Sequence, residues 1–311
     1  MKTSGVGHGT GKIILMGEHA VVYGEPAIAF PFRGVGVTAM FNPSDQNQMT
    51  SSHYSGLLAN APEPLQMIQE LTKRLCEEFQ QGPFHLIIES SVPSARGMGS
   101  SAAVATAITR AFFDWVDVEL SSEKLLAYVN FSESIAHGNP SGIDAATTSG
   151  SQPVYFEKEK AFEAFPLNID AYLLVADTGI LGRTREAVAA VARLRKTQPD
   201  ATNQFIHHLG TLSRLAKEAI IHNQPQALGE YMTLAQHDLR ALTVSNERLD
   251  TLIQLALDHG ALGAKLTGGG RGGCFIILCR DYQNAQHIET QLKHAGVTET
   301  WMQGLGVYEN V

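Results

Sequence analysis

The sequence is short of cysteine, of basic charge and of long apolar runs, and each shortage argues against a class of protein. Three cysteines in 311 residues, none in a C-x-x-C pair, fit neither a disulfide framework nor a structural zinc site. The 23 basic residues face 31 acidic ones, for a net charge of −8, and form no Lys/Arg-rich block. Because nucleic-acid affinity comes mainly from neutralising phosphates, we expect no nucleic-acid partner. A small phosphorylated ligand stays compatible with this charge, since a few backbone amides can hold a phosphate.

No apolar run approaches the roughly 20 residues that a membrane-spanning helix needs, and residues 1–5 lack the apolar core of a signal peptide. We therefore expect no membrane partner and a cytoplasmic location. The composition, 44% hydrophobic and 17% charged, is that of an ordinary folded protein. At about 150 residues per domain, the length predicts two domains or one large one.

Hydrophobic periodicity predicts a strand-rich first half and a helix-rich second half. In the first half we expect strands at 12–16, 27–30, 35–41 and 84–88, a turn-rich loop at 42–64, and helices at 65–79, from 100 onward and at 122–137. In the second half we expect strands at 171–176, 262–266, 275–278 and 297–302, and helices at 183–197, 202–222, 225–241, 246–259 and 284–294. The change near Pro166 predicts two domains, at 1–165 and 166–311.

A glycine-rich segment near the N-terminus, residues 7–12 (GHGTGK), looks like a Walker A phosphate loop. That pattern needs glycine five residues before Gly11 and serine or threonine after Lys12, but Val6 and Ile13 stand there. We therefore reject the P-loop interpretation for this segment.

Residues 93–103 (PSARGMGSSAA) form a second glycine segment, which follows a predicted strand and opens an alanine-rich helix. Gly97 and Gly99 let the backbone turn its N–H groups inward, and the helix start adds the positive end of its dipole, so the segment predicts an anion site. Ser100 and Ser101 offer hydroxyls that can ligate Mg²⁺ or cap the helix. A plain glycine turn with a serine cap is the simpler alternative.

Two carboxylates bracket a Gly/Pro-rich loop: Glu133 on a predicted helix, and Asp144 eleven residues later. A hard cation needs carboxylate oxygens, and phosphoryl transfer needs a carboxylate near the accepting hydroxyl, so one residue of each kind would suffice. The alternative is that Asp144 caps a turn and Glu133 is a solvated helix residue.

The third glycine segment, residues 265–274 (KLTGGGRGGC), has five glycines in six positions between two apolar strands. It favours close backbone approach to a ligand over a flexible connector. Residues 12–24 (KIILMGEHAVVYG) start with Lys12, which a strand would project into a cleft. The alternative is a surface lysine followed by an ordinary turn histidine, His19.

Together these segments resemble the GHMP kinase superfamily, in the superfamily's order and over nearly the whole chain. Residues 93–103 are similar to its phosphate loop, with Met98 where leucine is commoner, and residues 267–274 are similar to its C-terminal glycine motif, with Arg271 interrupting the glycines. Within the superfamily, residues 17–24, 137–144 and 236–239 resemble the mevalonate kinases, and the short length resembles the bacterial members of that family.

The resemblance implies an α+β fold of two domains with the active site in the cleft between them. The N-terminal α/β domain would carry the phosphate loop, and the ferredoxin-like C-terminal domain would carry the glycine-rich loop. It also implies transfer of the γ-phosphoryl group of ATP, with Mg²⁺, to the primary hydroxyl of (R)-mevalonate, giving 5-phosphomevalonate and ADP. Phosphomevalonate kinase, another GHMP small-molecule kinase and a non-catalytic sensor on the same scaffold stay open. A homodimer would fit some members.

Residue by residue, the resemblance makes Asp144 and Lys12 catalytic and Glu133 and Ser101 ligands of Mg²⁺. Substrate positions fall on Glu18, His19, Ser141 and Thr184. Nucleotide positions fall on Pro93, Arg96, Gly97, Met98, Gly99, Ser100, Ser101, Ala102, Gly268, Gly269 and Gly270. The role of Arg96 stays open between added positive charge at the loop and simple solvation.

Overall fold

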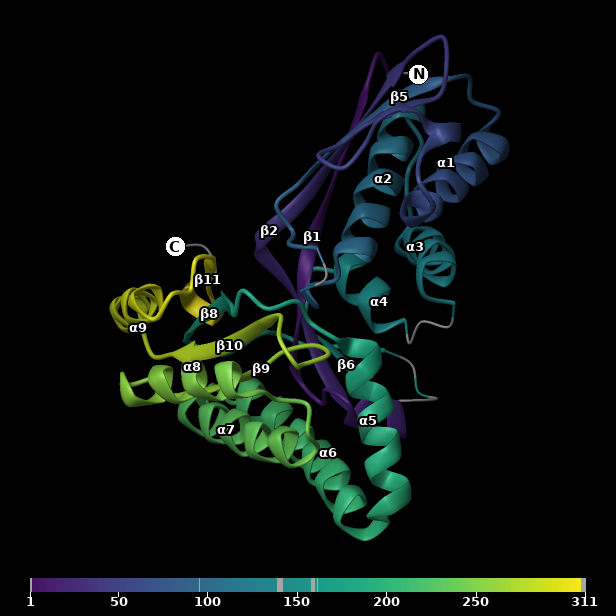
Figure 1. Cartoon of the computed structure of the whole chain (residues 1–311). Helices are drawn as coiled ribbons and strands as arrows, with labels where there is room; N and C mark the ends of the chain where they lie inside the picture. Colours follow the sequence, from purple (N-terminus) through teal and green to yellow (C-terminus); the bar gives the residue numbers. More distant parts are fainter. Residues whose placement is uncertain (1, 95, 139–141, 158–159, 161, 309–311) are drawn as a thin grey trace. The chain divides into compact units, whose positions relative to one another are not determined.

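The computed structural model describes residues 2–94, 96–138, 142–157, 160 and 162–308 (Figure 1). The chain folds into two compact units that are interleaved along the sequence. The first unit comprises Met1–Lys12, Pro31–Pro93 and Gly99–Ser151, and the second comprises Ile13–Phe30, Ser94–Met98 and Gln152–Val311. The predicted single boundary at residue 165 stays a prediction about domain organisation. The two units do not divide the chain at one point, since Ile13–Phe30 and Ser94–Met98 belong to the second unit.

Strands β1 (Gly5–Met16) and β2 (Ala27–Pro43) contribute residues to both units. In the first unit, β2 pairs antiparallel with β5 (Phe84–Ser90), and β5 pairs parallel with β3 (Gln48–Thr50). The short strand β4 (Ser55–Leu57) closes this edge of the sheet, and β1 pairs with β2. Buried positions alternate along β5 and along β2 from Val35 onward, as expected for a sheet with one covered face.

The described α-helices of the first unit are α1 (Gln66–Phe79), α2 (Ser100–Val116), α3 (Ser122–His137) and α4 (Ile143–Ser149). Helix α1 turns an apolar stripe inward at helical spacing, and α2 is apolar almost all round and is buried. Edge-to-face and stacked ring contacts close the core between sheet and helices, with Phe41 in contact with Phe84, Phe112 and Trp115.

The glycines that resembled a Walker A loop let α2 lie directly on β1. A Cβ atom added to Gly9 would lie 2.1 Å from the carbonyl oxygen of Ala103, and one added to Gly7 would lie 2.4 Å from that of Ala107. The same added atom at Gly5 would lie 2.3 Å from the carbonyl oxygen of Ala111. Because any side chain on this face of β1 would push the helix away, the alternating glycines have a packing role.

The second unit contains an antiparallel sheet in the order β11 (Thr300–Gly304), β8 (Tyr172–Asp177), β10 (Cys274–Cys279) and β9 (Gly263–Leu266). The central strands β8 and β10 are buried along their whole length, which explains their unbroken apolar sequences. Strands β6 (Val154–Phe156) and β7 (Glu163–Ala164) add to the start of β2.

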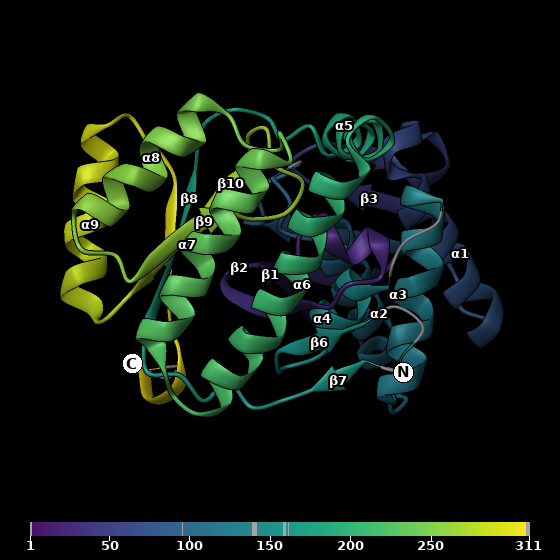
Figure 2. The same cartoon turned by 90° about the horizontal axis from the view of Figure 1, so that it is seen from below.

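The helices of the second unit pack on this sheet or on one another. Helices α6 and α7 lie side by side, and α7 and α8 pack on β9 (Figure 2). Helix α9 packs on β8, and α5 packs on α6. Their bounds are α5 (Thr184–Thr197), α6 (Pro199–Ile221), α7 (Pro225–Ala241), α8 (Glu247–Asp258) and α9 (Tyr282–His294). The 3₁₀ turns are η1 (Ala20–Tyr23), η2 (Leu58–Asn60), η3 (Glu63–Leu65) and η4 (Gly306–Tyr308).

The mixed α+β class and the positions of the long helices are confirmed. Three predictions of detail were wrong: β1 begins at Gly5, the strands predicted at 27–30 and 35–41 are one strand, and the predicted loop at 42–64 holds two short strands. Helix α4 was missed because it is only seven residues long. Within the described residues, none of the helices combines the length and apolarity required to span a membrane.

Candidate active site

Lys12 and Asp144 meet in the first unit. Lys12 Nζ lies 2.9 Å from Asp144 Oδ1, with the lysine side chain 4% exposed and the aspartate 32% exposed. Asp144 stands in the first turn of α4, which Gly142 starts in the left-handed conformation, with φ 81°. The ammonium group is therefore buried while its carboxylate partner stays accessible.

Gly99 shapes the space above this pair. It precedes α2 with φ 69°, and a Cβ atom added there would lie 2.6 Å from Cγ of Lys12. Position 99 therefore requires glycine for two reasons. Glycine adopts this left-handed backbone conformation easily, and any side chain there would collide with the side chain of Lys12. The first-unit part of the predicted phosphate loop, Ser100 and Ser101 included, therefore begins its helix against Lys12.

Glu133 is a buried carboxylate on α3. Its side chain is 3% exposed, and Oε1 is without a hydrogen-bond partner among the described residues. Burial raises the pKa of Glu133 above its usual value, and the charge of Asp144 acts in the same direction. Ser101 Oγ lies 3.1 Å from Nε2 of His137, which is 3.8 Å from Glu133 Oε2. The first unit thus groups two carboxylates, a lysine, a serine hydroxyl and a histidine.

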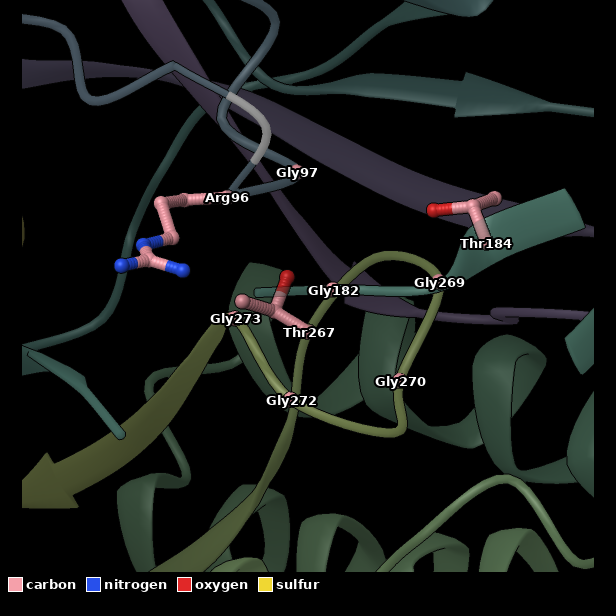
Figure 3. A pocket seen from close by; sticks show the side chains of 9 residues that line it. All are labelled: Arg96, Gly97, Gly182, Thr184, Thr267, Gly269, Gly270, Gly272 and Gly273. Carbon is pink, nitrogen blue, oxygen red and sulfur yellow. The ribbon is translucent and has the colours of Figure 1, made fainter. Parts of the chain in front are cut away.

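The second unit contains a pocket of about 200 Å³ (Figure 3). Backbone makes up most of its wall, and the lining residues are Arg96, Gly97, Gly182, Thr184, Thr267, Gly269, Gly270, Gly272 and Gly273. A Cβ atom added to Gly269 would lie 2.0 Å from Oγ1 of Thr184, and one added to Gly270 would lie 2.2 Å from the carbonyl oxygen of Val244. The glycines are therefore required for the close approach of this loop to its neighbours.

His19 is fixed against the same glycine loop. Its Nε2 donates to the carbonyl oxygen of Gly269 at 3.0 Å, and its backbone has φ 61°, which is rare for a residue other than glycine. Burial lowers the pKa of His19 to about 4, so the imidazole is neutral at neutral pH. Its neighbour Glu18 forms an ion pair with Lys265, and both side chains are fully buried.

Arg96 does not direct its charge into the pocket. Its Nε donates to Oδ2 of Asp177 at 2.7 Å, and in Figure 3 the guanidinium points away from Gly97 and Thr184. The sequence left the role of Arg96 open between added positive charge at the loop and simple solvation. In the structure, the guanidinium instead forms an ion pair with Asp177. The pair ties the segment Ser94–Met98 to the end of β8.

The remaining predicted residues divide between the two units. Pro93 and Ala102 belong to the first, with Ala102 buried in α2. In the second, Met98 is buried with its sulfur 3.8 Å from that of Cys274, and a Cβ atom added to Gly268 would lie 3.3 Å from Cα of Gly97. Ser141 lies outside the described residues.

Sequence reasoning missed two buried charged residues, Asp177 in β8 and Lys265 in β9. Each had a signal: Asp177 ends the strand YLLVAD, which is otherwise apolar, and Lys265 is the only charge in β9. A charge in a strand that is buried on both faces requires a partner, and each of these residues has one.

Two family descriptions match the chain. GHMP kinases N terminal domain matches residues 66–151, and GHMP kinases C terminal matches residues 216–298. Each match falls on one of the regions that carried the resemblance, and together they define the class of protein as a GHMP kinase.

Individual relatives narrow the class. A mevalonate kinase from Pyrococcus abyssi is 33% identical, with 96% of each chain covered. The crystal structure of the mevalonate kinase from Staphylococcus aureus is 35% identical with a TM-score of 0.78, covering 98% of this chain and 100% of that one. The L. major mevalonate kinase in complex with R-mevalonate shares the fold, with 24% identity, a TM-score of 0.86 and coverages of 97% and 96%. The chain belongs to the mevalonate kinase family of the GHMP kinases.

Proposed function

We propose that this protein transfers the γ-phosphoryl group of ATP to the primary hydroxyl of (R)-mevalonate, giving 5-phosphomevalonate and ADP. The observation that carries the proposal is the contact of 2.9 Å between Lys12 and Asp144 in a chain of the mevalonate kinase family. This pair supplies the two groups that phosphoryl transfer to an alcohol needs: an acceptor for the proton and a positive charge.

Asp144 orients the hydroxyl of mevalonate and receives its proton. The bond from that oxygen to the γ-phosphorus forms while the bond from phosphorus to the bridging oxygen of ADP breaks, and the proton passes to the carboxylate late in this exchange. A carboxylate is too weak a base to deprotonate an alcohol before the phosphoryl group begins to transfer. Its partial exposure, 32%, supports this role because a substrate can reach it.

Lys12 holds Asp144 and faces the charge that develops on the transferred group. The buried ammonium holds the carboxylate of Asp144 in place through a direct ion pair of 2.9 Å. Positioning and charge stabilisation account for most of the catalysis in such reactions, because the transition state is loose and needs little covalent help from the protein.

Nucleotide phosphates are held by backbone groups in our proposal. The glycine-lined pocket of the second unit offers N–H groups without side chains that would fill the space, and Gly97, Gly269 and Gly270 line it. In the first unit, the start of α2 at Ser100 offers the positive end of a 17-residue helix, which also favours an anion. An acidic protein can hold ATP in this way without a basic patch.

Glu133 and Ser101 fit a magnesium ion bound with the nucleotide. The partnerless buried Oε1 of Glu133 is a hard ligand whose burial a cation would offset, and Ser101 offers a hydroxyl. Among the described residues, no group of three or more His, Cys, Asp or Glu side chains could hold a metal ion by itself. An ion bound by Glu133 and Ser101 would take its other oxygen ligands from phosphates and water. When bound, Mg²⁺ would neutralise phosphate charge.

His19, Thr184 and Ser141 are the proposed substrate positions. His19 is neutral and fixed by Gly269, and Thr184 turns its hydroxyl into the pocket in Figure 3. Glu18 supports this group indirectly, because its carboxylate is fully buried against Lys265 rather than open to a ligand. A cytoplasmic location and a homodimer stay predictions.

Phosphomevalonate is the competing acceptor. Solved phosphomevalonate kinases share the fold at 17% identity, which carries no argument about the substrate. Kinetics with both acceptors decide: we expect kcat/KM for (R)-mevalonate to be higher by about tenfold or more. A preference of that size for phosphomevalonate would overturn the proposal. A non-catalytic sensor would release no ADP when mevalonate is added, and the presence of Lys12, Glu133 and Asp144 argues against one.

A further inference from the structure

The Arg96–Asp177 ion pair lies beside the pocket, and the proposed mechanism does not use it. The two side chains are only 17% and 9% exposed, and Nη1 of Arg96 is buried with no hydrogen-bond partner among the described residues. Arg96 lines the pocket, yet its guanidinium points away from Gly97 and Gly269 (Figure 3). An arginine held in this way contributes its backbone to the pocket wall and its charge to Asp177.

Asp177 is the point where three segments of the pocket wall meet. While Oδ2 accepts from Arg96, Oδ1 accepts from the backbone N–H of Gly179 at 2.9 Å. The next residue, Thr178, donates from its backbone N and its Oγ1 to the carbonyl oxygen of Gly273, at 3.1 and 2.8 Å. The carboxylate of Asp177 therefore connects the segment before Gly97 with the segment that leads to Thr184, and its neighbour Thr178 connects the latter segment to the glycine loop.

The charge of Asp177 makes its partner necessary. Among the nine described residues that line the pocket, Arg96 alone is charged, and the rest are glycine and threonine. A buried carboxylate next to this pocket would repel an anion, since charges inside a protein are weakly screened. The guanidinium cancels that repulsion at a distance of 2.7 Å.

We propose that Arg96 and Asp177 are a positioning pair for nucleotide binding. Asp177, with its neighbour Thr178, ties the three backbone segments of the pocket together, and Arg96 removes the negative charge that Asp177 would otherwise present to the phosphates. The inference rests on the proposed function, because it takes ATP to be the ligand of the pocket.

The test is calorimetric titration of the full-length protein with MgATP in the absence of mevalonate. For Arg96→Gln we expect a Kd weaker by about tenfold, because Asp177 is left unpaired next to the phosphates. For the double variant Arg96→Gln/Asp177→Asn we expect a Kd within about threefold of the wild type, because the second change removes the unpaired charge. If Arg96 binds the phosphates directly, the double variant stays as weak as the single one, and the proposal is overturned.

Two further variants keep the outcome interpretable. Should Arg96→Gln fail to fold, the double variant is compared with Asp177→Asn, and a loss of about tenfold between those two also overturns the proposal. Arg240→Gln is the matched control, since it breaks an ion pair of 3.1 Å with Asp250 in the same unit and should leave Kd unchanged. A wild type that binds no ATP refutes the proposed function, whereas a wild type that binds ATP and an Arg96→Gln variant of equal Kd refute only the positioning pair.

Discussion

The two units use different parts of the chain for what we propose is one reaction. In the first unit the candidate residues are charged or polar side chains, with Lys12, Asp144 and Glu133 buried or half-buried. In the second unit the pocket wall is mostly glycine backbone. Side chains can accept protons and ligate metal, whereas backbone amides can hold phosphate but cannot titrate. We infer that chemistry and nucleotide binding are separable by mutation.

The largest expected effect is a loss of turnover without a loss of ATP binding. Asp144→Asn should lower kcat by about 10³-fold, within the range for loss of a proton acceptor, while Kd for ATP changes by less than about threefold. Coupled ADP release and calorimetry give the two numbers. Asp170→Asn, a change at a half-buried aspartate of the second unit that bonds Asn223, is the matched control. An Asp144→Asn variant with substantial turnover would contradict the proposed role.

The next largest effect concerns His19, whose imidazole contacts the glycine loop. Its folded pKa is about 4, and an unfolded histidine has a pKa of about 6.5. The unfolded chain therefore binds the additional proton, and stability is lost as pH falls from 6.5 towards 4, by roughly 3 kcal/mol at most.

Chemical denaturation between pH 4 and pH 7 measures this loss. The His19→Gln variant should show a shallower dependence than the wild type, and the exposed His53→Gln should match the wild type. Parallel curves for wild type and His19→Gln would show that His19 is not the group responsible.

One substitution, glycine to alanine, sharpens the comparison when it is made in both units. At Gly7 the new methyl meets the backbone of α2, and at Gly269 it meets Thr184. Each should cost about 1–3 kcal/mol. Gly7→Ala should lower the free energy of unfolding and leave KM for ATP unchanged, whereas Gly269→Ala should raise KM for ATP. If both variants change the same parameter, the two glycine segments do not differ in role.

The smallest expected effect concerns the metal. Glu133→Gln keeps the shape of the side chain but removes its charge, so the Mg²⁺ concentration for half-maximal activity should rise by about tenfold. Glu157→Gln, at a carboxylate that pairs with Lys160, is the control. A Mg²⁺ titration identical to that of the wild type would argue against Glu133 as a ligand.

Local signals in the sequence were enough to predict most of the fold. The apolar periodicity of α1 and α8 and the unbroken apolar runs of β8 and β10 each have one reading, because their length and period agree. The continuity of β2 could not be predicted, since Pro31, Arg33 and Gly34 read as a break. Short β6 and β7 depend on pairing with β2, which local pattern does not contain.

Candidate site residues could be predicted from the sequence where they lie in a recognisable motif. Their contacts could not be predicted where the partner residue lies far away along the chain. Lys12 and Asp144 followed from the resemblance, and the structure brings them into contact. The partners of Arg96 and Glu18 lie 81 and 247 residues away, a separation that no local spacing reveals. The sequence could therefore show that Arg96 departs from the family's pattern, but it could not show which residue Arg96 pairs with.

The bare face of β1 under α2 suggests a way to tune turnover from a distance. Gly9 contacts the backbone of Ala103 near the start of the helix, and Gly99, one turn earlier, borders the stem of Lys12. A methyl group at residue 9 would tilt the beginning of that helix outward and so widen the gap between Ser101 and the lysine. A change at this packing contact can in this way alter reactivity without replacing any of the reacting groups.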